Sequence, residues 1–169
     1  PRSTQGVSSA ASDVYKRQSK PRRGSAGVPI PLTGLAQVGI NGVSKVQAWL
    51  HPKDKPLPSG DPYFQKAPWQ DMKLLPPPMD FGGGLPKDAI GPGVCPPVHG
   101  FDPKTGRPTS WPQAYSLVHW AGLLPGVAAG RFELSCRAIN NRGVDQPLPR
   151  PFRKSGASDI ERVSLTVRD

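Results

Sequence analysis

The sequence is poor in cysteine and contains no long apolar run. Cys95 and Cys136 are its two cysteines, which allow one disulfide bond but not the framework of a disulfide-rich domain. No apolar stretch approaches the about 20 residues that a membrane-spanning helix needs. A charged segment followed by an apolar one, as in a secretory signal peptide, is not visible near residue 1. The sequence therefore displays neither a membrane span nor an export signal.

Common catalytic and metal-binding motifs are also missing. The three histidines, His51, His99 and His119, are scattered and do not have the spacing of metal ligands. No serine lies in a nucleophile elbow. The glycines at 82–84 are not followed by the Lys-Ser/Thr pair of a phosphate-binding loop. We expect no metal, hydrolytic or nucleotide site in this chain.

Proline and glycine, by contrast, are abundant, at 23 and 19 of 169 residues. Proline removes a backbone donor and glycine loses much entropy in a helix, so this composition argues against a helical protein. Fifteen of the prolines lie between Pro52 and Pro112. The sequence therefore predicts long irregular insertions at 51–68 and 76–112 within an otherwise compact fold.

The net charge of +10 is concentrated near the beginning of the chain. Residues 1–24 contain six basic side chains and one acidic side chain, which is half of the excess. A basic patch can bind anions or phosphate backbones. We favour a flexible basic arm followed by a mildly basic surface, and we expect no nucleic-acid or membrane partner. Any nucleic-acid binding should disappear when residues 1–24 are removed.

Residues 13–18 read Asp-Val-Tyr-Lys-Arg-Gln. This string matches the in-frame translation of a transposon adaptor end used in sequencing libraries. We therefore interpret residues 1–18 as adaptor and read-through sequence, expected to be disordered and excluded from the fold. A genuine basic linker is the alternative. Residues 19–27 are then a basic connector, and residues 28–169 form a single domain in a fragment of a longer protein.

Six segments show the features of β-strands. Their apolar residues alternate or form short runs between turn signals, and they cover residues 35–38, 45–50, 69–75, 115–124, 130–140 and 160–167. Segment 115–124 has apolar residues on both faces, as in a strand buried on both sides, and a short helix is its alternative. Gly143 permits a turn after segment 130–140. Short strands without a long helix predict an all-β, antiparallel β-sandwich.

The stretch 130–147 carries a resemblance to a known family. It reads G-R-F-E-L-x-x-R-A-I-N-x-x-G-x-x-Q-P. This resembles a late-strand motif in the C-terminal dimerisation domain of sulfite-oxidase-type molybdopterin oxidoreductases. The strand 46–50, the strand opened by Trp69 and the closing strand 160–167 are similar to the other pieces of that domain, in the same order. The resemblance covers residues 26–168.

The resemblance implies an immunoglobulin-like (E-set) β-sandwich with a role beside catalysis. Its partners would be a second copy, in a homodimer, and an upstream molybdopterin-binding domain of the same chain. Molybdopterin and molybdenum would lie in that domain, whose own cysteine ligates the metal, so this fragment alone would hold no cofactor and catalyse nothing. The parent would be a bacterial enzyme, often periplasmic. The insertions 51–68 and 76–112 depart from the family and bear on the dimer geometry.

The resemblance also implies one candidate substrate contact, Arg153. It occupies the place from which the family's last domain contributes an arginine to the oxyanion pocket, and a guanidinium suits such an anion. The alternative is a solvated loop arginine beside Arg150 and Lys154. Neither Cys95 nor Cys136 is expected to bind metal.

A rival function comes from another class of protein. A secreted carbohydrate-binding or adhesion module would keep a β-sandwich and use exposed Trp49, Trp69 or Trp111 as platforms for sugars.

Overall fold

The computed structural model describes residues 22–61, 64–77, 108–145 and 160–169. These residues form strands and connecting loops. They contain no helix, and therefore no helix that could cross a membrane. The strands are β1 (Arg22–Ser25), β2 (Ile30–Gln37), β3 (Val43–Pro52), β4 (Gln70–Leu74), β5 (Leu117–Leu124), β6 (Gly130–Asn140) and β7 (Glu161–Arg168). The predicted all-β class is confirmed.

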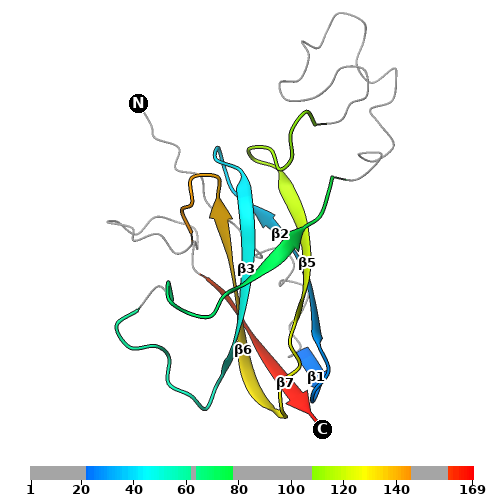
Figure 1. Ribbon diagram of the computed structural model, residues 1–169, viewed down its shortest axis with the longest axis vertical. Helices are drawn as coiled ribbons and strands as arrows, with labels where there is room; N and C mark the ends of the chain where they lie inside the picture. Colours follow the sequence, from blue (N-terminus) through cyan, green and yellow to red (C-terminus); the bar gives the residue numbers. More distant parts are fainter. Residues whose placement is uncertain (1–21, 62–63, 78–107, 146–159) are drawn as a thin grey trace, which may run out of the picture.

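The strands form one sheet in the order β1-β7-β6-β3-β4-β5-β2, which curls until it is nearly a barrel (Figure 1). The sheet is mixed rather than purely antiparallel, because β1 runs parallel to β7. The short strand β4 joins the two halves of the sheet. Met72 pairs with Val46 of β3, whereas Leu74 pairs with Trp120 of β5.

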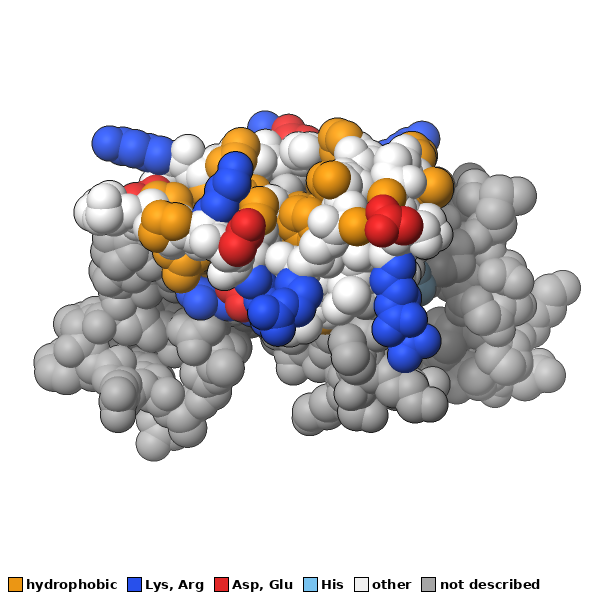
Figure 2. Space-filling view, turned by 90° about the horizontal axis from the view of Figure 1, so that it is seen from below, with side chains coloured by type: hydrophobic (Ala, Val, Ile, Leu, Met, Phe, Trp, Pro, Cys, Tyr) orange, Lys and Arg blue, Asp and Glu red, His pale blue; other side chains and the backbone are white. Residues whose placement is uncertain are grey.

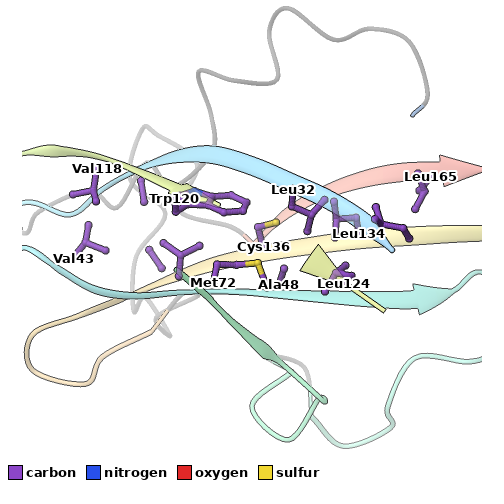
Figure 3. Close-up of a cluster of buried hydrophobic side chains, with 14 of the residues drawn as sticks. Leu32, Val43, Ala48, Met72, Val118, Trp120, Leu124, Leu134, Cys136 and Leu165 are labelled. Carbon is purple, nitrogen blue, oxygen red and sulfur yellow. The ribbon is translucent and has the colours of Figure 1, made fainter. Parts of the chain in front are cut away.

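The main core lies inside this curled sheet. β2 and β5 lie across the buried side chains from β3 and β6 (Figure 3). The alternation predicted for 45–50 and 130–140 places one side-chain parity of β3 and β6 in this core. Its members include Leu32, Val43, Ala48, Met72, Val118, Trp120, Leu124, Leu134, Cys136 and Leu165.

Two glycines make room for the largest core side chains. Gly34 of β2 pairs with Trp120 of β5, and a Cβ at Gly34 would overlap the indole ring. Gly122 of β5 faces inward in the same way, and a Cβ there would overlap the Met72 side chain. Because protein cores are close-packed, the overlap at Gly34 requires the Trp120 ring or its strand to move, whereas the flexible Met72 side chain can shift away from a Cβ at Gly122.

A glycine turn at Gly42 precedes β3, and the turn predicted at Gly143 follows β6. Gly42 and Gly143 both adopt positive φ angles, of 62° and 75°. In the second turn the Asn140 side chain accepts hydrogen bonds from the backbone amides of Arg142 and Val144, at 2.8 and 3.0 Å. These side-chain contacts fix the reversal that follows β6.

The connector expected at 19–27 contains strand β1. The polar sequence of Arg22–Ser25 has no apolar alternation, so nothing in its pattern indicates a strand. The strand forms through pairing with β7, and it is continued by a 2.7 Å hydrogen bond from the Ala26 amide to the Arg168 carbonyl. The sheet therefore begins before residue 28.

Residues 117–124 of the predicted segment 115–124 form β5, so the short-helix alternative is wrong. The expectation that both faces of this strand are buried is also wrong. Val118, Trp120 and Leu124 point into the core, whereas Leu117 and Leu123 are 47% and 65% exposed. The apolar groups of the second parity therefore lie on the outer face of the sheet.

Candidate interaction surface

The residues proposed from sequence divide between described and undescribed parts of the chain. Arg153 and Cys95 lie outside the described residues, as do residues 1–18 and most of the insertion 76–112. Cys136 is buried among core side chains of β6. Cys136 therefore serves as a small apolar core residue.

The two histidines that the structure describes lie apart. His51 is buried on the outer face of β3, where its Nε2 atom is 3.0 Å from the Lys55 carbonyl oxygen and its ring packs on Trp49. His119 is exposed on β5. Within the described parts of the chain, no three histidine, cysteine or carboxylate side chains gather in a way that could hold a metal ion.

A second apolar cluster covers the outer face of β3. Trp49 is only 6% exposed, because the described part of the 51–68 insertion folds back over it. Its ring contacts those of Phe64 and Trp69 at centroid distances of 5.5 and 5.8 Å, and Ile160 completes the cluster. The alternation of segment 45–50 puts Trp49 on the face opposite Val46, but it does not indicate that this face is covered.

Arg137 joins this cluster to a polar network. Its Nε donates to Gln47 Oε1 at 2.9 Å, and its Nη1 donates to Asp145 Oδ2 at 2.6 Å. Its guanidinium carbon lies 4.3 Å from the centre of the Trp69 ring. The side chain is only 7% exposed. One buried guanidinium therefore contacts β3, the residue that precedes β4 and the turn after β6.

The network extends outward through Gln47 to Asp71. Gln47 Nε2 donates to Asp71 Oδ1 at 2.7 Å, and Lys45 Nζ lies 3.3 Å from Asp71 Oδ2. The Gln47 hydrogen bond, helped by Lys45, lowers the pKa of Asp71 below its usual value of 3.8. Burial lowers the pKa of Arg137, and Asp145 opposes that shift. Arginine nevertheless stays charged in proteins, so Arg137 serves as a fixed cation.

This network is suited to holding strands and loops together rather than to chemistry. Its carboxylates bind cations of the same protein, and its cation stacks on an aromatic ring. The alternation of segment 130–140 puts Arg137 on the face opposite the apolar residues Leu134 and Cys136. It contained no signal that Asp145, Gln47 and Trp69 meet there, because their meeting depends on strand register.

The outer face of β2 and β5 has a different character. Its side chains lie in cross-strand pairs and include no lysine, arginine, aspartate or glutamate. They are Pro31, Thr33, Leu35 and Gln37 of β2 and Leu117, His119, Ala121 and Leu123 of β5. We call this the β2–β5 face. Depletion of charge with exposed leucine is typical of the centre of a protein interface.

The three tryptophans suggested as sugar platforms are not exposed. Trp49 is buried, and Trp69 and Trp111 are half-buried. The indole N–H groups of Trp69 and Trp111 donate to the carbonyls of Phe64 and Leu75, at 2.6 and 2.9 Å. This arrangement gives the carbohydrate-binding alternative no specific support.

No protein-family model matches the chain. No curated protein matches it either.

Proposed function

We propose that the chain is the C-terminal dimerisation or interface domain of a sulfite-oxidase-like molybdopterin oxidoreductase. By itself it catalyses nothing and holds no cofactor. The main observation in favour of an interface role is the exposed apolar surface of the β2–β5 face. Unlike the outer face of β3, which is covered by Trp49, Phe64 and Trp69, this face exposes Leu117 and Leu123 to solvent.

Support for the family comes from the contacts of Arg137. This arginine lies in the motif 130–147, and it also binds Asp145 of that motif. Its other partners, Gln47 and Trp69, lie in the two earlier segments that resemble the same family. The pieces that carry the resemblance are thus in mutual contact, as expected for the parts of one fold.

The finer fold that we propose is an immunoglobulin-like (E-set) sandwich. One layer would contain β1, β7, β6 and β3, and the other β5 and β2. The strand β4 would belong to both, because it pairs with β3 through Met72 and with β5 through Leu74. Pairing of a β-strand with both halves is compatible with a sandwich whose edge is nearly closed.

The dimensions of the β2–β5 face suggest that it is the centre of a larger contact. Two eight-residue strands span about 26 Å by about 10 Å, a footprint of roughly 260 Å². A stable dimer buries about 800 Å² on each partner. We expect the face to pair with a second copy of the chain, and we expect this contact alone to be weak.

The experiment is sedimentation of the 169-residue chain over a range of concentrations. Weak, concentration-dependent self-association is expected. Leu123→Glu, which places a charge on the β2–β5 face, should abolish it. The control is Leu57→Glu, which makes the same change at another exposed leucine, outside that face. A highly soluble monomer at every concentration, or equal effects of both variants, would contradict the interface role.

The identity of the parent is tested separately, by reading the gene upstream of this segment in an uninterrupted assembly. A molybdopterin-binding domain with its metal-ligating cysteine supports the proposal. A glycoside hydrolase or an adhesin upstream would overturn it and favour the secreted-module alternative.

A further inference from the structure

A row of basic side chains crosses four neighbouring strands at one end of the sheet. Arg23 of β1 and Arg131 of β6 are both register partners of Thr166 in β7. Lys53, which follows β3, lies beside Arg131, because its backbone amide donates to the Arg131 carbonyl at 2.9 Å. We call these four residues the basic row. Their neighbours along the strands, including Gly24, Phe132 and Val167, point inward, so the row lies on the outer face.

The three cations of the basic row have no carboxylate partner among the described residues. The ion pairs of the described chain involve other cations: Lys45, Arg137 and Arg162. Glu133, the acidic residue on the outer face of β6, lies 3.8 Å from Arg162 instead. Asp54 follows Lys53 in the sequence, and Asp169 lies shortly after Thr166. Neither carboxylate forms an ion pair with the row.

The cations also remain accessible to solvent. Arg23, Arg131 and Lys53 are exposed, and Thr166 between the two arginines is half-buried. Lys53 Nζ is held over β7 by a 2.8 Å hydrogen bond to the Ser164 hydroxyl. Figure 2 looks onto the end of the molecule where β7 finishes, and it shows Lys and Arg side chains at several places around that end, with Asp and Glu side chains beside some of them.

Placing like charges side by side on a sheet is unfavourable. Arg131 and Lys53 lie on neighbouring strands, which are about 5 Å apart, and like charges directly opposite each other destabilise a sheet. A bound anion would remove this repulsion. Arg23 and Arg131 flank Thr166 from its two sides, so their long side chains can converge on one group above its hydroxyl.

We propose that the basic row binds a tetrahedral oxyanion, the group shared by phosphate and sulfate. Two guanidiniums offer paired N–H donors that suit the oxygens of such an anion. The Lys53 ammonium and the Thr166 hydroxyl add a further charge and a donor. Three positive charges match a dianion better than a single carboxylate. None of the four residues is aromatic, so the row lacks the stacking surface that single-stranded nucleic acids use.

This site is distinct from the β2–β5 face, which lies on the strands at the other end of the sheet order. It does not depend on the proposed family or on Arg153. Failure of one proposal would therefore leave the other unaffected.

The test is a titration of the 169-residue chain with inorganic phosphate and, separately, with sulfate. Amide NMR shifts monitor each titration, and chloride keeps the ionic strength constant. Saturable shifts centred on Arg23, Arg131 and Thr166 are expected, with a dissociation constant on the order of 1 mM. Arg131→Gln should weaken binding about fivefold, the most that one exposed ion pair contributes. Thr166→Val should also weaken it while keeping the charge.

The matched control is Arg142→Gln, which removes one positive charge from an exposed turn outside the row. It should change the affinity less than about twofold. Equal losses in Arg131→Gln and Arg142→Gln would indicate only general electrostatic attraction and overturn the site. Linear shifts without saturation would also overturn it. Amide spectra of each variant identify any that fails to fold, and Thr166→Val, which alters no charge, then provides the decisive comparison.

A second arm distinguishes the sources of the group. The same chain is mixed with a sulfated polysaccharide, with duplex DNA and with vesicles containing an anionic phospholipid. One informative result is that inorganic phosphate competes with one of these ligands for the wild-type chain but not for Arg131→Gln. That result would assign the oxyanion to that polymer or surface. Binding of inorganic phosphate without binding of any of them would assign a free anion. DNA binding that survives Arg131→Gln but disappears when residues 1–21, which precede β1, are removed would attribute the affinity to the basic arm and count against the row.

Discussion

The guanidinium carbon of Arg137 lies 4.3 Å from the centre of the Trp69 ring, although the two residues are far apart in sequence. The stacked arginine also binds Gln47 and Asp145. Arg137 occupies a polar position in an alternating strand. In the folded domain it connects β3, the residue before β4 and the turn after β6.

Replacing Arg137 should destabilise the domain. Arg137→Ala removes the partner of Asp145 and opens a space beside Trp69. The free energy of unfolding should fall by about 3 kcal/mol, at the lower end for a broken buried ion pair because Asp145 keeps some contact with water. Urea unfolding measures this change. Arg137→Lys should lose less, because it keeps the charge but not the planar fork. Equal stability of wild type and Arg137→Ala would contradict the structural role.

The pKa of Asp71 predicts a pH dependence of stability. Its pKa is lowered in the folded state, so its contribution is fully present above the unfolded value, near 3.8, and is lost as the pH falls through the lower folded value. Asp71→Asn should flatten the loss of stability below about pH 4. Unfolding measured between pH 2 and pH 7 tests this dependence, with Asp54→Asn as the exposed control. The effect should be small, because more than half of the Asp71 side chain is exposed.

Gly34→Ala should destabilise the domain through steric overlap with Trp120. The added methyl group would strike the indole ring, and overpacking of this kind costs about 1–3 kcal/mol. Gly24→Ala is the control, because a Cβ at Gly24 would meet Val167 Cγ2 at 3.6 Å, an ordinary contact. Thermal unfolding of both variants gives the comparison. Similar melting temperatures for the two would contradict the proposed packing.

The Arg153 prediction belongs to the full-length parent enzyme and rests on the proposed function. Arg153→Ala should raise the KM for an oxyanion substrate or markedly lower kcat/KM, because it removes one charged donor from the substrate pocket. Steady-state kinetics tests this prediction, with Lys154→Ala as the neighbouring control. Unchanged kinetics in Arg153→Ala would remove this residue from the site.

Several features could be predicted from local pattern alone. The alternation in 45–50 and 130–140 indicated strands β3 and β6 and identified which parity enters the core. Gly143 marked the turn after β6, and proline and glycine excluded long helices. These predictions succeed because backbone geometry gives strands a repeat of two residues, which does not depend on distant neighbours.

Other features were decided only by the tertiary structure. Strand β1 has no apolar pattern and exists through its pairing with β7. The sequence pattern predicted that the outward leucines of β5 are buried, but the structure places them on an uncovered face of the sheet. Trp49, by contrast, is covered by a loop. The basic row joins Arg23, Arg131 and Thr166 of three strands with Lys53, which follows β3. The sequence by itself determined which residues alternate and where the chain turns. Strand order and register determined which distant residues meet, because these depend on packing between segments that no local repeat encodes.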